Sequence, residues 1–97
     1  MTRVVLDRAA GELTLSGHAG SAEAGRDLVC AALSALCCTL ELIPGAEVLR
    51  DEAFRSVSVP RERQGELEAI GRGFGMLARE FPRYVGFEER GTEGEGK

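Results

Sequence analysis

The sequence predicts an α+β domain of two layers, in which two helices pack on one face of a single, mainly antiparallel sheet. Strand-like and helix-like segments follow one another in the order strand, strand, helix, strand, strand, helix, strand. The chain has 97 residues, of which 43% are hydrophobic and 29% charged, as is typical of a globular protein with one core. We therefore expect a single domain over residues 1–90 and a flexible tail over residues 91–97.

A hairpin is predicted at the start of the chain. The segment RVVLD (3–7) has the character of one strand and GELTLSG (11–17) that of a second, with Gly11 suited to the tight turn between them. Leucines alternate with polar residues in the second strand. This alternation predicts a buried face with Leu13 and Leu15 and an exposed face with Glu12, Thr14 and Ser16.

The first helix is predicted over residues 26–43, because Pro44 and Gly45 end the helical pattern. Its apolar side chains gather on one face, which we expect to cover the sheet: Leu28, Val29, Ala32, Leu33, Leu36, Leu40 and Ile43. The opposite face would carry Asp27, Cys30, Ser34, Cys37, Cys38 and Glu41. Cys30 is thus expected outside the aliphatic stripe, although a free cysteine is most often a small buried hydrophobe.

Two strands, a helix and a last strand complete the pattern. AEVLRDEAFRSVSVP (46–60) predicts a strand pair around a turn near Asp51 and Glu52, and RYVGFEE (83–89) predicts an edge strand. Between them a helix is predicted over residues 64–81. Its buried stripe would be Leu67, Ile70, Gly71, Phe74, Leu77, Ala78 and Phe81. GRGFG (71–75) lies inside this helix, so we interpret its glycines as permitting close packing and not as a phosphate-binding loop.

Charge and hydropathy argue against several classes of function. Sixteen acidic residues against twelve basic ones give a net charge of −4, whereas general nucleic-acid binding needs clustered positive charge. No stretch approaches the length of a membrane span, and the first residues lack the apolar run of a signal peptide. We expect a cytoplasmic protein with no nucleic-acid or membrane partner.

The three cysteines are expected to be reduced thiols. On one helix Cys30 and Cys37 would lie roughly 10 Å apart along the axis, beyond the reach of a disulfide, and a bridge between the adjacent Cys37 and Cys38 would distort the helix. Packing against a neighbouring element or a subunit contact explains Cys37 and Cys38 better than a redox pair. A zinc site usually needs four ligands in paired spacings, which the single histidine cannot complete, so we expect no metal and no cofactor.

Cys30 and His18 form the candidate reactive pair. Cys30 lies near a helix start, and the histidine twelve residues upstream lies on a segment that can fold back over it; both features favour a thiolate. A thiolate beside an imidazolium is the arrangement used by cysteine proteases. Asp27 could orient the histidine or favour the helix dipole, and Ser34 could line a site or bond back to the helix. The spacing leaves both roles open.

The segment GHAGSAEAGRDLVCAALSAL (17–36) closely resembles the signature of the ribosomal-processing cysteine protease family, in which glycine-histidine-alanine precedes a G-x-D-[IL]-V-C-A-A helix start. The resemblance covers nearly the whole chain, up to an aromatic-Pro-x-Tyr-Val segment, here FPRYV (81–85). It implies a small cytoplasmic homodimer that removes the N-terminal extension of the bacterial large-subunit ribosomal protein number twenty-seven. It also implies that Cys30 is the nucleophile and His18 the proton donor and acceptor, with Asp27 and Ser34 in supporting roles.

A glycine-bracketed loop separates the two candidate catalytic residues and is expected to close over substrate. Its members are Gly20, Ser21, Ala22, Glu23, Ala24 and Gly25. Many relatives carry tyrosines in this loop, where this chain has Ser21 and Ala24. We therefore expect unchanged chemistry but a somewhat different cleavage sequence.

Two rival functions stay open at the level of the sequence. A ribosome-assembly factor on the same scaffold would bind the ribosomal protein without cutting it. A thiol redox sensor would use Cys30, Cys37 or Cys38, and its response would survive the loss of His18.

Overall fold

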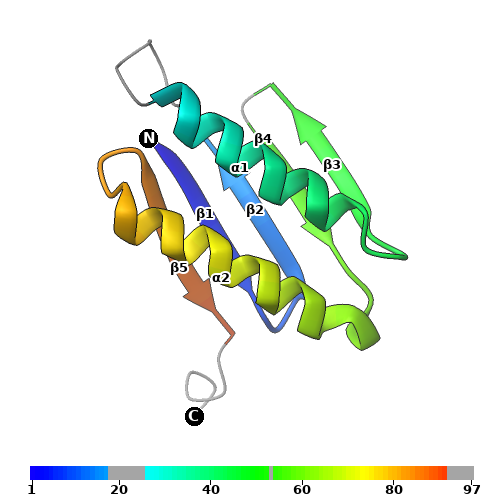
Figure 1. The fold of residues 1–97 in the computed structure, drawn as a ribbon. Coiled ribbons are helices and arrows are strands. Elements are labelled where there is room, and N and C mark those ends of the chain that lie inside the picture. The colour runs from blue at the N-terminus through cyan, green and yellow to red at the C-terminus, as the bar shows by residue number, and fades with distance from the viewer. Residues whose placement is uncertain (18–25, 53, 92–97) are drawn as a thin grey trace.

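The computed structural model describes residues 1–17, 26–52 and 54–91 and shows a five-stranded sheet with two helices on one face (Figure 1). The elements are β1 (Thr2–Asp7), β2 (Glu12–Ser16), α1 (Arg26–Glu41), β3 (Glu47–Asp51), β4 (Phe54–Ser58), a 3₁₀ turn η1 (Arg61–Arg63), α2 (Gln64–Glu80) and β5 (Val85–Arg90). The strand order is β3-β4-β2-β1-β5, and only β1 and β5 pair in parallel. The predicted α+β fold is confirmed, including the edge position of the last strand. Residues 92–97 of the predicted tail lie outside the described residues.

The hairpin of β1 and β2 forms where the sequence predicts it. Gly11 adopts a left-handed φ of 65° in the turn, a conformation that glycine reaches without strain. Leu13 is fully buried and Leu15 packs against the core. In the pairing of β2 with β4, Leu13 lies opposite Val57 and Leu15 opposite Arg55. A charged residue therefore stands on the helix-covered face of β4.

One apolar core fills the space between the helices and the sheet. Its buried members are Val4, Leu6, Leu13, Val29, Leu33, Cys37, Leu40, Ile43, Val57, Leu67, Phe74, Leu77 and Val85. Two glycines bring α2 close to the sheet: a Cβ would stand 3.0 Å from Leu6 at Gly71 and 3.4 Å from Phe87 at Gly75. The interpretation of GRGFG as a close-packing segment is confirmed.

The first helix departs from the prediction in its end and in its buried face. It ends at Glu41 rather than residue 43, because the backbone there tightens into bonds of the i to i+3 type. Leu28, expected to be buried, is 76% exposed, whereas Cys37, expected on the opposite face, is 1% exposed. The buried stripe centres near Leu33, from which Leu28 lies about 140° and Cys37 only about 40° around the helix.

The second helix ends at Glu80, one residue before its predicted end. Phe81 was expected on the buried stripe, but it is 39% exposed. The backbone leaves the helix at this residue, where φ is −131°, and its N–H caps the helix by donating to the carbonyl of Leu77 at 2.8 Å. Neither helix in the described part of the chain has the length and apolarity needed to cross a bilayer.

Candidate active site

A cavity of about 250 Å³ opens between α1 and the strands β2 and β4. Its lining residues are Thr2, Leu15, Gly17, Cys30, Leu33, Ser34, Cys37, Asp51, Glu52, Phe54 and Arg55. Figure 1 shows that the end of β2, the first turns of α1 and the start of β4 lie at the same end of the domain. The cavity therefore collects residues from segments far apart in the sequence.

Cys30 lies in the second turn of α1 and is half-buried in the wall of this cavity. The Cα–Cβ bonds of a helix tilt toward its N-terminal end, and the N–H groups of a first helical turn have no acceptors within the helix. Ser34 follows one turn later and lines the same cavity. The structure thus brings together two of the predicted site residues.

The other predicted site residues cannot be placed against Cys30. His18 and the loop over residues 20–25 lie outside the described residues, as does the side chain of Asp27. Gly17, which directly precedes the histidine, does line the cavity. Its φ is 88°, and a Cβ on it would stand 2.6 Å from the backbone oxygen of Met1. The backbone conformation of Gly17 and its close approach to Met1 therefore require glycine at this point of the cavity wall.

A stripe of polar and sulfur-containing side chains on α1 meets the β3–β4 hairpin. Its members, spaced i, i+4, i+7 and i+11, are Cys30, Ser34, Cys37 and Glu41. Arg50 and Arg55 lie directly opposite each other on β3 and β4, and both approach Glu41. Oε1 of Glu41 accepts a hydrogen bond from Nη2 of Arg50 at 2.5 Å, and its Oε2 lies 3.7 Å from Nε of Arg55. These ion pairs attach α1, the helix that carries Cys30, to the β3–β4 hairpin.

Cys37 also lines the cavity, but its environment keeps the thiol protonated. Burial raises the pKa of Cys37, and a hydrogen bond from Arg55 offsets this effect only in part. The same hydrogen bond is the main reason that the pKa of Arg55 lies above its ordinary value. The guanidinium is therefore charged while the thiol is neutral, and a neutral thiol is a poor nucleophile.

The strand side of the cavity is not apparent from the sequence. Asp51 and Glu52 mark only a turn there. Arg55 carries one usable signal, its alternation with Val57, which predicts the buried face of β4. This face of β4 lies near Cys30 because β4 pairs with β2. The spacing of residues in the sequence does not predict that pairing. Over residues 1–17, 26–52 and 54–91, no group of three or more His, Cys, Asp or Glu side chains is placed to hold a metal ion.

The family model of cysteine protease Prp matches residues 1–86. The chain belongs to this family. A search of the curated proteins gave no significant match. Membership in the Prp family makes the chain one of a group of cysteine protease hydrolases.

Solved structures share the fold of this Prp family member. SMU.848 from Streptococcus mutans has a TM-score of 0.69 and 25% sequence identity, with 92% of this chain and 91% of that chain covered. The essential ribosomal processing protease Prp from S. aureus, with a covalently linked product peptide, has a TM-score of 0.75 and 18% identity over 93% of this chain and all 100% of that one. Its structure with a substrate peptide has a TM-score of 0.69 and 16% identity over 92% and 97%.

Proposed function

We propose that this protein is a cysteine endopeptidase that removes the N-terminal extension of a large-subunit ribosomal protein, with Cys30 as nucleophile and His18 as proton donor and acceptor. One observation carries the proposal: in a chain of the Prp family, the half-buried thiol of Cys30 lines a cavity at the start of α1. The two structures of the S. aureus ribosomal processing protease, one with a product peptide and one with a substrate peptide, support the class of substrate.

The proposed reaction runs through a thioester. The Cys30 thiolate attacks the scissile carbonyl carbon, forming a C–S bond, and the peptide C–N bond breaks as the imidazolium of His18 gives its proton to the leaving amine. Water then attacks the thioester carbon while the neutral imidazole takes its proton. The C–S bond breaks, which releases the new carboxyl group and restores the thiolate and imidazolium.

The start of α1 offers N–H donors that could stabilise the negative charge that develops on the carbonyl oxygen. The N–H groups of its first turn lack acceptors within the helix, and Cys30 follows in the second turn. Such donors stabilise the oxyanion of acyl transfer. Asp27 and Ser34 then have supporting roles, and the loop over residues 20–25 closes over the bound peptide.

We further propose that the enzyme acts in the cytoplasm as a homodimer and without a nucleic-acid partner. The resemblance to the ribosomal-processing proteases supports all three points. The homodimer is also supported by Leu28, a large apolar side chain that is 76% exposed two residues before Cys30. Light scattering on the purified protein tests the dimer. A mass equal to the 10.4 kDa of a single chain would contradict it.

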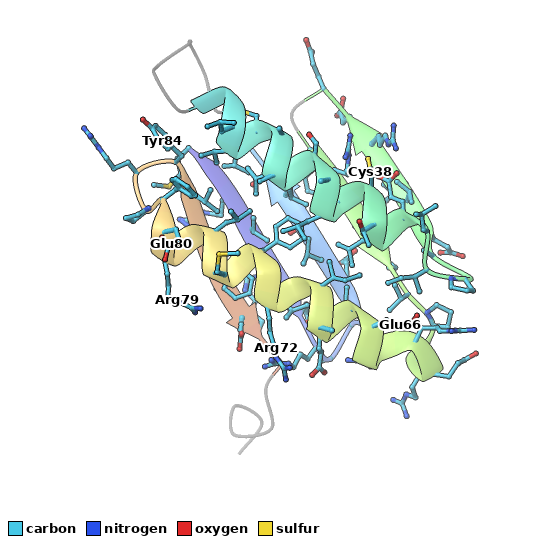
Figure 2. All side chains as sticks on the ribbon, in the orientation of Figure 1. Cys38, Glu66, Arg72, Arg79, Glu80 and Tyr84 are labelled. Carbon is cyan, nitrogen blue, oxygen red and sulfur yellow. The ribbon has the colours of Figure 1, made fainter. Side chains whose placement is uncertain are left out.

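The activity is tested by incubating the purified protein with the full-length ribosomal protein precursor from the same source and measuring product masses. We expect one cut near the precursor's N-terminus, which Cys30→Ala and His18→Ala each abolish. Cys38→Ala is the matched control, because Cys38 is an exposed cysteine of the same helix that does not line the cavity (Figure 2). This variant is expected to cut at the wild-type rate.

The two rival functions predict different outcomes. A binding module would retain an uncut precursor after long incubation, and Cys30→Ala would change nothing. A redox sensor would respond to oxidant in the His18→Ala variant as in the wild type. An intact precursor after long incubation, or a His18→Ala variant that keeps full activity, would contradict the proposed protease.

A further inference from the structure

A groove of about 530 Å³ lies between α2 and the edge strand β5. Its lining residues are Arg72, Gly75, Ala78, Arg79, Phe87 and Glu89. The helix comes closest to the strand at Gly75, where a Cβ would stand 3.4 Å from the ring of Phe87. No described residue lines both this groove and the cavity of Cys30, which lies over β2 and β4. The groove is therefore a separate feature of the molecule.

Two arginines on the helix side of the groove carry charges that no described residue neutralises. Arg72 and Arg79 are both exposed and lie seven residues, and so about 10 Å, apart along α2 (Figure 2). Neither forms an ion pair or a side-chain hydrogen bond with another described residue. Glu89, in contrast, binds Arg8 at 3.0 Å. The groove therefore presents two positive charges, while the carboxylate in its described wall is already paired.

The strand side of the groove is a sheet edge. Within the described residues β5 pairs only with β1. The N–H of Arg8 donates to the carbonyl of Arg90 at 2.9 Å, so the even-numbered residues of β5 are those whose backbone groups bind the neighbouring strand. The backbone N–H and C=O groups of Phe87 and Glu89 therefore point away from β1. An edge of this kind can pair with a further strand.

We propose that this groove binds an extended acidic segment of another protein, which adds as a strand to the edge of β5. Its main chain pairs with the backbone of Phe87 and Glu89. Alternate side chains of a strand point to the same face, and four residues span about 13 Å, which matches the separation of Arg72 and Arg79 within the reach of their side chains. The segment therefore has the pattern acidic-x-apolar-x-acidic, with its apolar side chain against Phe87 and Ala78.

The sheet edge favours a peptide over a nucleic acid. Nucleic-acid binding needs clustered positive charge, whereas the chain has a net charge of −4. Donors and acceptors alternate along a strand edge, and another main chain matches both. The inference goes beyond the proposed proteolysis, because a segment on β5 lies outside the cavity of Cys30 and is bound without being cut.

The test measures the binding of fluorescently labelled nine-residue peptides to the full chain by anisotropy. The probe is TVETLTEVT, which carries two glutamates on one face of a strand with a leucine between them. The charges are absent from TVQTLTQVT. The glutamates lie on opposite faces in TVETLETVT, which has the same composition. We expect the probe to bind about tenfold more tightly than either control peptide, and more weakly as the salt concentration rises.

Arg72→Gln and Arg79→Gln are each expected to weaken binding of the probe about threefold, and the double variant about tenfold. Binding of TVQTLTQVT should not change. Arg61→Gln is the matched control, because Arg61 is also exposed and also has no ion pair with a described residue, but it lies in η1 outside the groove. This variant should bind the probe as the wild type does.

Addition of a strand is tested on the backbone of the probe. Every second residue of the bound segment directs its N–H toward β5. Methylation of single backbone nitrogens should therefore abolish binding at alternate residues and be tolerated at the residues between them. Equal tolerance at every position would show that the main chain does not pair with the edge.

Other outcomes would also overturn the proposal. They include no binding of the probe, equal binding of the three peptides, and equal losses in Arg61→Gln and Arg72→Gln. A probe that binds only after removal of residues 92–97 would make the chain's own C-terminal segment, with Glu93 and Glu95, the occupant. A change of solution mass in the double arginine variant would make the occupant a second copy of the chain.

Discussion

Nε of Arg55 on β4 lies 3.7 Å from Oε2 of Glu41 on α1, and that oxygen is buried and has no hydrogen-bond partner among the described residues. The ion pair crosses from the sheet to the helix that carries Cys30. Arg50 on β3 binds the other carboxylate oxygen. One buried carboxylate therefore attaches both strands of the hairpin to the cavity helix, and its loss should loosen this wall.

Glu41→Gln is expected to lower the free energy of unfolding by about 1–3 kcal/mol, because it leaves a partly buried guanidinium without its counter-charge. The side chain of Glu41 is only 15% exposed and that of Arg55 30%. Urea unfolding at pH 7 measures the change. Glu66→Gln is the control, since its pair with Arg63 is 47% and 43% exposed. It should cost no more than about 0.5 kcal/mol, and equal losses would contradict the importance of the buried pair.

Stability is expected to fall in alkali because of Cys37. Burial raises the pKa of this thiol in the folded protein, so the unfolded chain releases the proton first as the pH rises through about 8.5. The resulting stabilisation is complete below that pH and is lost as the pH rises toward the folded pKa. Cys37→Ala should lower the free energy of unfolding by about 1–2 kcal/mol at pH 7. The difference in this free energy between the variant and the wild type should be smaller at about pH 9.5. A constant gap in urea unfolding would contradict this.

Gly17→Ala is expected to destabilise the protein by about 1–3 kcal/mol and to lower cleavage of the precursor, because an alanine at φ 88° is strained and its Cβ would meet the Met1 backbone at 2.6 Å. Gly65→Ala is the matched control. It lies in α2, where an added Cβ would have no neighbouring atom within 4 Å, so the change should be neutral or stabilise by up to about 1 kcal/mol. Thermal unfolding and a cleavage assay compare the two. Similar effects of the two substitutions would show that position 17 does not require glycine.

The sequence predicts the layered fold well because its signals are local. Alternation in β2, the stop at Pro44 and the glycines of α2 each act over a few residues, and the structure confirms the elements that they predict. Cys30 and Ser34 line the same cavity, as their spacing of one helical turn predicts. The buried face of a helix is predicted less well. The observed buried face of α1 is rotated slightly from the predicted one, so that Leu28 is exposed and Cys37 is buried.

The strand side of the site could not be predicted, since it depends on pairing between distant segments. Arg55 reaches the cavity only because β4 pairs with β2, and Glu41 reaches Arg55 only because α1 packs over that pair. Neither contact corresponds to a regular spacing of residues in the sequence. The one local indication is that Arg55 alternates with Val57 along the strand. This alternation predicts that Arg55 lies on the buried face, but it does not predict which residue Arg55 contacts.

Alkylation of the three cysteines tests the cavity directly. Cys38 is exposed, Cys30 half-buried and Cys37 buried, so iodoacetamide should modify the first two in the native protein and Cys37 only slowly. The precursor's N-terminal peptide, added to His18→Ala at ten times its dissociation constant, should slow modification of Cys30 about tenfold by occupying the cavity. Cys38, outside the cavity, serves as the internal control and should react at an unchanged rate. Equal protection of Cys30 and Cys38, or protection of neither, would place peptide binding elsewhere, because a ligand in the cavity must cover the one sulfur and leave the other open to solvent.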